Sequence, residues 1–173
     1  GSRLFQALNV EPGPLADIDD FPEIPAGKVA FVVTSLEMCA RPEPMPTAST
    51  AFDIRRVHRP GIDWYRELFR HVGTDWLWFG RLKLDDAALA RIVHDPQIEV
   101  YALSVDGRDE GLLELDFRTA GESEILYFGV SAKLIGRGAG RELMSFALGT
   151  AWAQRIQRLW LHTCTGDHPG ALR

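Results

Sequence analysis

A glycine-rich turn between a strand pattern and a helix pattern constrains the fold of this chain more than any other feature. Residues 124–130 form an apolar strand pattern, and residues 136–140 are Gly-Arg-Gly-Ala-Gly. Residues 141–155 then carry apolar side chains at the four-residue spacing of a helix, and a second strand pattern follows at 159–164. Strand, helix and strand in this order form a crossover unit, so we expect the two strands to be parallel neighbours.

An antiparallel meander is predicted immediately before this unit. The strand patterns 98–105 and 111–117 are separated by Asp106-Gly107, a strong hairpin signal, and a polar turn leads from the second pattern into 124–130. Two short amphipathic helices are expected before the meander, over residues 63–71 and from Asp85-Asp86 to a point before Pro96.

The first part of the chain is an arm of different character. Its β-branched run at 28–36 is predicted to be a buried strand, and the Pro-rich run at 41–46 cannot continue a sheet. We therefore expect an N-terminal arm with one strand and a linker over residues 1–49. Residues 50–173 are expected to form an α/β domain of the α+β kind, with a mostly antiparallel, mixed sheet flanked by helices.

Composition limits the classes of function. The chain has 173 residues with 24 acidic side chains against 19 lysines and arginines, a formal net charge of −5. Nucleic acid is not an expected partner, because phosphate binding needs a concentrated basic face. No membrane span or signal peptide is recognisable, so we expect a cytoplasmic protein without a membrane partner. Cys39 and Cys164 lack metal-ligand spacing, and we expect free thiols and no metal site.

The glycine-rich turn has the composition of a phosphate cradle. Glycines permit positive φ and close approach of the backbone, and the helix behind them offers free amides with a partial positive charge. A structural strand-to-helix turn is the alternative. Neither of two nucleotide motifs fits, because a dinucleotide fingerprint needs glycine where Arg141 stands and a P-loop needs Lys-Ser or Lys-Thr. The candidate phosphate-binding residues are Gly136, Arg137, Gly138, Ala139, Gly140 and Arg141.

Residues 124–144 resemble the acyl-CoA signature of the GNAT superfamily of N-acetyltransferases. That signature runs from a strand into (R/Q)-x-x-G-x-(G/A) and then a helix. Gly138 and Gly140 occupy its last two small positions, whereas Ile135 stands where the family has Arg or Gln. The resemblance covers roughly residues 50–173 and implies a GNAT-like acyl-CoA N-acyltransferase fold with acetyl-CoA (coenzyme A) as donor. It also implies that a closing helix and a last strand lie beyond Arg173.

The resemblance implies roles for residues on two strands. In the family, the pantetheine arm of coenzyme A lies against a splayed pair of parallel strands and pairs with the strand that bears the signature. The matching positions here are Phe128, Gly129 and Val130. The backbone N–H of Phe128 would polarise the thioester carbonyl. Glu124 matches a glutamate that is the general base in several members, although an exposed strand-entry residue is the alternative. Glu114, on the neighbouring strand, is the rival candidate for the base.

Several other residues keep two interpretations. The family tyrosine that protonates the CoA thiolate would follow Arg173. His162 and His168 are candidate substitutes, although a lone histidine near a strand end is more often a structural hydrogen-bonding group. Cys164 is expected to be a strand residue rather than a nucleophile, because no motif pairs it with a base. The aromatic segment 76–79 is either packing surface or lining of an acceptor pocket.

These patterns favour one function and leave two alternatives. We expect direct transfer of an acetyl group from acetyl-CoA to a primary amine of a small molecule or a protein. A non-catalytic acyl-CoA-binding or sensing module is the first alternative, and an interaction domain built on the Pro-rich arm is the second. The sequence does not identify the amine. A homodimer is also considered, because a strand edge and an aromatic N-terminal region are expected.

Overall fold

The protein is represented by a computed structural model that describes residues 6–7, 24–43 and 52–171. The end of the Pro-rich run and the expected boundary at residues 49 and 50 lie outside the described residues. The elements in chain order are β1 (Gln6–Ala7), β2 (Val33–Met38), β3 (Asp53–Arg56), α1 (Ile62–Gly73), η2 (Thr74–Trp76), η3 (Arg81–Lys83), α2 (Asp86–Val93), β4 (Ile98–Val105), β5 (Arg108–Asp116), β6 (Glu122–Val130), η4 (Ala132–Leu134), α3 (Ala139–Ala153) and β7 (Arg158–Cys164).

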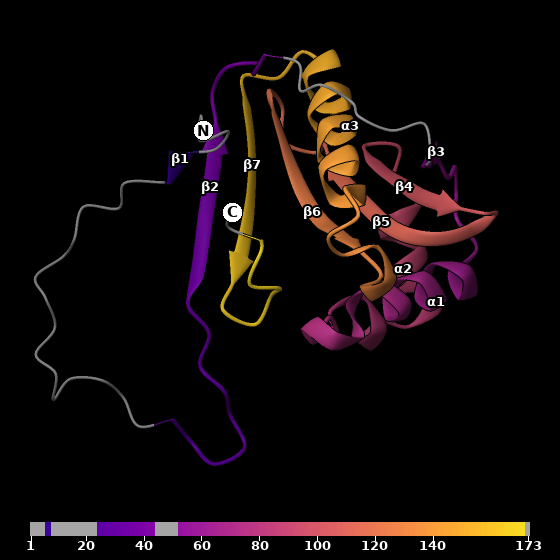
Figure 1. Ribbon diagram of the computed structural model, residues 1–173, viewed down its shortest axis with the longest axis vertical. Helices are drawn as coiled ribbons and strands as arrows, with labels where there is room; N and C mark the ends of the chain where they lie inside the picture. Colours follow the sequence, from indigo (N-terminus) through magenta and orange to yellow (C-terminus); the bar gives the residue numbers. More distant parts are fainter. Residues whose placement is uncertain (1–5, 8–23, 44–51, 172–173) are drawn as a thin grey trace, which may run out of the picture.

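The described strands form one seven-stranded sheet in the order β1-β2-β7-β6-β5-β4-β3 (Figure 1). Neighbouring strands are antiparallel except β6 and β7, which are parallel. The predicted meander is confirmed, because β4, β5 and β6 are consecutive neighbours in space. The predicted crossover is confirmed as well, because α3 connects the two parallel strands.

The hydrophobic core lies in two layers, one on each face of the sheet. Leu113 and Leu115 of β5 pack in one cluster with Leu143 of α3. Leu112, the residue before Leu113, belongs to a second cluster, with Tyr65 of α1. This alternation follows from the two-residue period of a strand. Helix α3 therefore covers one face, and α1 with α2 covers the other. Within the described residues, no helix combines the length and the apolarity needed to cross a bilayer.

The helix starts follow from local capping. Helix α3 begins at Ala139, two residues before the predicted start, because Gly138 adopts a φ of 87° and forms the N-cap. Only glycine takes such a conformation at little cost. Helix α2 begins after Asp85, whose carboxylate accepts a hydrogen bond from the Ala88 amide at 2.7 Å. This cap satisfies one of the free amides of the first turn.

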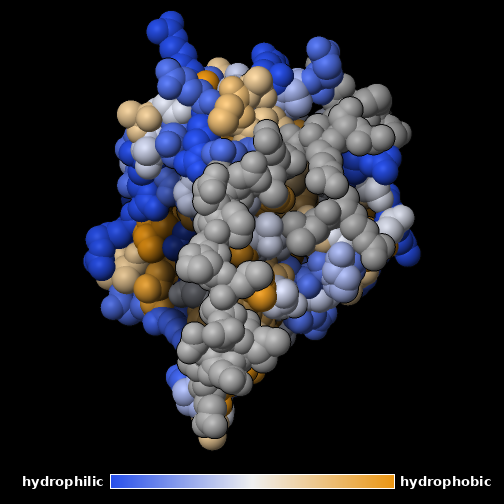
Figure 2. Space-filling model, turned by 90° about the vertical axis from the view of Figure 1, so that its left-hand side faces the viewer, coloured by the Kyte–Doolittle hydropathy of each residue, from blue (hydrophilic) through white to orange (hydrophobic). Residues whose placement is uncertain are grey.

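The prediction for the N-terminal strand is wrong in position and in burial. Strand β2 spans Val33–Met38 rather than 28–36. Val33 pairs with Cys164, the last residue of β7, so the residues before it extend past the neighbouring strand. The residues before Val33 are exposed for that reason. Figure 2 faces this edge of the molecule and shows apolar residues at the surface. The exposed large apolar residues of this segment are Ile24, Val29, Phe31, Val32 and Val33.

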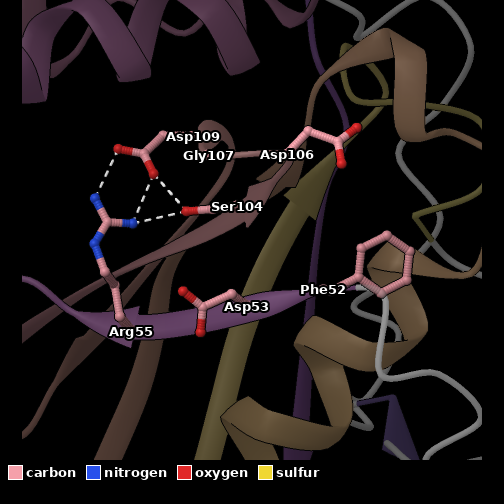
Figure 3. A pocket seen from close by; sticks show the side chains of 7 residues that line it. All are labelled: Phe52, Asp53, Arg55, Ser104, Asp106, Gly107 and Asp109. Carbon is pink, nitrogen blue, oxygen red and sulfur yellow. Dashed lines mark hydrogen bonds and ion pairs between the residues drawn. The ribbon is translucent and has the colours of Figure 1, made fainter.

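Asp109 is the centre of a hydrogen-bond network at the β3 edge of the sheet (Figure 3). Arg55 of β3 donates two hydrogen bonds to its carboxylate, at 2.6 and 2.8 Å. The Ser104 hydroxyl of β4 and the Trp64 indole of α1 donate two more, at 2.6 and 3.0 Å. A hollow of about 510 Å³ adjoins this network. It lies among β3, β4 and β5, away from the two parallel strands, and its arginine and carboxylate already satisfy each other.

Replacement of Asp109 by asparagine should lower stability in a pH-dependent way. The hydrogen bonds from Arg55, against the effect of burial, lower the pKa of Asp109 to about 2. Its stabilisation is therefore complete above the ordinary pKa of about 3.9 and is lost as the pH falls towards 2. Because Arg55 is half-exposed, we expect Asp109→Asn to cost about 1–2 kcal/mol at pH 7.

Urea unfolding of both proteins at pH 7, 5, 4 and 3 measures this effect. The difference between wild type and Asp109→Asn should shrink below pH 4. A difference that stays constant down to pH 3 would contradict the role assigned to Asp109.

Candidate active site

The two parallel strands pair over only part of their length. Residues Glu122–Ile125 of β6 pair with Arg158–Leu161 of β7, and the pairing ends there. Both strands continue for several residues, and Figure 1 shows them close together at their starts and apart at their tips. We call this opening between the carboxyl-terminal parts of β6 and β7 the fork.

A β-bulge lies where the fork opens. Glu114 of β5 pairs with Tyr127, and the next residue, Leu115, pairs with Ile125. Leu126 is therefore an extra residue with no partner on β5. Leu126 and Tyr127 both pack in the cluster of α1 and α2, although they are consecutive residues. A bulge bends the strand that carries it, and here it turns β6 away from β7.

The backbone of Phe128 and Val130 faces the fork. The Ser131 amide donates to the Glu110 carbonyl of β5 at 2.7 Å. Hydrogen-bonding groups alternate sides along an antiparallel strand, so residue 129 also faces β5, whereas residues 128 and 130 face the opposite side. Their N–H and C=O groups therefore point towards β7, where the ladder has ended. The side chains of Phe128 and Val130 pack in the α3 cluster.

At Gly129, β6 comes into close contact with the core layer formed by α1 and α2. A Cβ atom on Gly129 would lie 2.7 Å from Cγ1 of Val72 and 3.1 Å from the Trp78 ring. Packing therefore requires glycine at this position. The backbone groups of Gly129 face β5 and not the fork. Its part in the site is to hold the strand against α1.

The glycine-rich turn follows β6 after the short helix η4. Gly136 and Gly138 have φ values of 76° and 87°, so both conformations favour glycine. The first bond of α3 runs from the Glu142 amide to the Gly138 carbonyl at 3.0 Å. The amides of residues 139–141 consequently have no acceptor within the helix. Arg137 and Arg141 are exposed beside them. These residues form the donor set that an anion needs.

Lys133 of η4, just before the turn, is already paired. Its ammonium group lies 3.1 Å from Glu110, which also contacts His71 at 2.6 Å. Burial opposes ionisation of Glu110, but polar contacts that include His71 and Lys133 outweigh it and lower its pKa to about 2. The pair fixes η4 to the start of β5.

Glu124 lies at the closed end of the fork, opposite a histidine. Its carboxylate is 15% exposed and lies 3.2 Å from Nδ1 of His162 on β7. Burial raises the pKa of Glu124, and the neighbouring His162 partly offsets that rise. A carboxyl with a raised pKa is a better proton acceptor at neutral pH than an exposed one. The structure thus brings Glu124 and His162 together, although the sequence analysis did not pair them.

Glu114 is held by a buried ion pair. It is fully buried, accepts a hydrogen bond from the Tyr65 hydroxyl at 2.5 Å and pairs with the Arg81 guanidinium. Arg81 also lies over the Tyr127 ring, 5.2 Å from its centre. Burial and the Glu114 carboxylate raise the pKa of Tyr65 well above its ordinary value. This geometry favours a structural role for Glu114 over the role of a free base.

The aromatic segment 76–79 is divided between packing and surface. Trp78 packs on Phe69 and Tyr127 in the α1 layer. Leu77 and Phe79 are exposed. The Trp76 ring meets the His168 ring edge-on at 5.0 Å, and this contact holds the turn after β7 against η2. His168 also accepts a hydrogen bond from the Gly170 amide at 2.9 Å.

Sequence reasoning missed the bulge and both buried partners of Glu114. The only available signal was Glu114 itself, a charged residue between leucines in a strand. Such a residue is almost never buried unless it is paired. Arg81, 33 residues earlier, has no pattern that identifies it as the partner.

Replacement of Glu114 by glutamine should destabilise the fold strongly. It would leave the Arg81 charge, which is only 13% exposed, without its carboxylate. Breaking such a pair typically costs about 3–5 kcal/mol. Urea unfolding at pH 7 measures the loss, and Glu114→Gln combined with Arg81→Met should recover most of it. Equal stability of the Glu114→Gln protein and the wild type would show that the pair is not structural.

The sequence profile of the Acetyltransferase (GNAT) family matches residues 62–173. No curated protein has a significantly similar sequence. Among solved structures, the aminoglycoside acetyltransferase meta-AAC0020 from an uncultured soil metagenomic sample, in complex with trehalose, superposes with a TM-score of 0.56 at 12% identity. This match covers 68% of this chain and 80% of that one.

A second aminoglycoside acetyltransferase from an uncultured soil metagenomic sample, HMB0005, has a TM-score of 0.53 at 14% identity. It matches over 65% of this chain and 79% of its own. At these identities the likeness concerns the fold. The expected fold is confirmed, and the profile match spans more than half of the sequence. The chain belongs to the GNAT family of acetyltransferases.

Proposed function

We propose that this chain transfers the acetyl group of acetyl-CoA to a primary amine of a small molecule or a protein, by direct attack of the amine. Membership of the acetyltransferase family supports acetyl transfer in general. The observation that carries the more specific proposal is the fork. Its backbone groups on β6, which no described strand pairs, are followed by η4 and then by the glycine-rich turn at the start of α3.

The residues present fit an acyl-CoA in two respects. The backbone groups of Phe128 and Val130 face the fork, where no described strand pairs with them. A Cβ atom at Gly136, Gly138 or Gly140 would meet no heavy atom within 4 Å, so open space lies before the turn. The backbone groups would hold the amides of the pantetheine arm, and the turn would hold the pyrophosphate.

Each group contributes a different part of the chemistry. Bound acetyl-CoA would supply the thioester that the amine attacks. The Phe128 N–H would stabilise negative charge that develops on the thioester carbonyl oxygen during attack. Glu124 would take a proton from the amine, which is nucleophilic only when neutral. Arg137 and Arg141 would add positive charge beside the phosphates.

A panel of amines tests the proposed reaction. It contains a polyamine, an aminoglycoside, several amino acids and a peptide with a free N-terminus, each mixed with the protein and acetyl-CoA. The proposal predicts that free CoA thiol appears only when a suitable amine is present. Binding of acetyl-CoA without release for any of these amines would instead support a non-catalytic binding module.

Substitution of Gly138 by aspartate should weaken acetyl-CoA binding. A side chain at a φ of 87° is strained, and a carboxylate there would repel phosphate. We expect at least a tenfold increase in the dissociation constant, about 1.4 kcal/mol, in calorimetry. Gly107→Asp is a matched control, because Gly107 has a φ of 75° and open surroundings in the β4–β5 turn. Equal affinities for both variants would remove the turn from the site.

Substitution of Glu124 by glutamine should remove the proton acceptor while keeping the shape. We expect kcat to fall by about 10²–10⁴, with the affinity for acetyl-CoA unchanged. Glu67→Gln, on the exposed surface of α1, is the control and should keep the wild-type rate. Steady-state kinetics from pH 6 to 9 measure both. A Glu124→Gln protein with the wild-type rate at every pH would refute this role.

A further inference from the structure

His162 and Glu124 lie on the two sides of the closed end of the fork. The last paired residues of the two strands are Ile125 and Leu161. Glu124 precedes this pair on β6, and His162 follows it on β7. Ile125 and Leu161 pack in the α3 cluster, so the side chains of their neighbours point to the opposite face of the sheet. The contact between the Glu124 carboxylate and Nδ1 of His162 therefore spans the point where the strands separate.

The two partners differ in their access to solvent. The Glu124 side chain is 15% exposed, whereas the His162 side chain is 48% exposed. The carboxylate is thus the inner group and the imidazole the outer one. A proton that reaches Glu124 has a titratable neighbour 3.2 Å away that itself reaches water.

The other charged groups around Glu124 are already engaged with each other. Asp116 of β5 disfavours the carboxylate form of Glu124, and Arg118 favours it. Arg118 hydrogen-bonds both carboxylate oxygens of Asp116, so the two charges largely offset each other. From β7, the titratable group in contact is His162. The balance between burial and charge at Glu124 is therefore adjusted mainly by this histidine.

We propose that His162 is a positioning residue that acts through Glu124, holding the carboxylate at the fork and carrying its proton to solvent. This inference rests on the proposed acetyl transfer. Neither the glycine-rich turn nor the backbone groups of β6 are needed for it. It follows from the register of β6 and β7 and from the contact between the two side chains.

The proton balance of the reaction explains why such a partner is useful. An amine arrives as an ammonium ion and must lose one proton before its nitrogen attacks. The nitrogen–carbon bond forms, the carbon–sulfur bond breaks, and the nitrogen loses a second proton. One proton ends on the CoA thiol, and the other must reach solvent. Glu124 accepts a proton and returns to carboxylate by passing it to His162, which releases it to water.

The pH dependence separates this role from that of an ordinary surface ion pair. His162 lowers the otherwise raised pKa of Glu124. Removing it should therefore raise that pKa, and activity should be lost at a higher pH as the solution is made more acidic. In the His162→Gln variant we expect the acid limb of kcat/KM to move up by about half a pH unit or more. We also expect kcat at pH 7 to fall at least fivefold, with KM for acetyl-CoA within twofold of wild type.

The experiment uses the whole chain and the fastest amine of the panel. His58→Gln is the control, because His58 is exposed and follows the edge strand β3, which β6, β5 and β4 separate from β7. A pH titration of the Glu124 carboxyl followed by carbon-13 NMR gives a second readout that needs no turnover. The pH at the midpoint of this titration should rise in His162→Gln but not in His58→Gln.

The outcomes distinguish this inference from the proposed function. Absence of CoA release by the wild-type protein with every amine would reject the proposed function, and the inference with it. An active wild type whose kcat and pH profile are unchanged in His162→Gln would overturn the inference alone. An unchanged Glu124 midpoint in that variant would also overturn it, because the pair would then not be coupled. A shifted midpoint with unchanged kcat would reduce the pair to a structural contact.

Discussion

The extra residue at Leu126 determines the geometry of the site. It shifts the register between β6 and β5 by one residue and coincides with the end of pairing between β6 and β7. Beyond it, the backbone groups of Phe128 and Val130 that face the fork have no partner among the described strands. Unpaired backbone groups are costly unless water or a ligand satisfies them. A sheet that leaves such groups open along one strand is therefore prepared to receive an extended polar molecule.

The layer of α1 supports the bent strand from one side. Both Leu126 and Tyr127 turn towards it, Gly129 permits close contact with Val72, and Arg81 lies over the Tyr127 ring. Arg81 is in turn fixed by Glu114 of β5. Helix α3 holds the alternate residues Phe128 and Val130 from the other face. Strand β6 is thus held between the layer of α1 and α2 and the layer of α3, and only its backbone edge faces the fork.

The parts of the fold that depend on local patterns were predictable from the sequence. Strand-like runs and the turn residues between them predicted the meander, and four-residue spacing predicted α3 to within two residues of its ends. The bulge was not predictable, because Leu126 is an ordinary apolar residue in an apolar strand. The start of β2 at Val33 was not predictable either, since the exposure of the residues before it depends on where β7 ends. The contact between Glu124 and His162 depends on the register of two strands joined by a helix, which no local pattern encodes.

The central claim is that the fork strand binds acyl-CoA through its backbone. Residue-resolved amide hydrogen exchange by NMR, with and without coenzyme A, tests it most directly. The claim predicts slower exchange for the amides of Phe128 and Val130 and for residues 136–141 when coenzyme A is added. The amides of the β4–β5 hairpin should exchange at unchanged rates. Bound coenzyme A with no change in exchange at Phe128 and Val130 would contradict the claim.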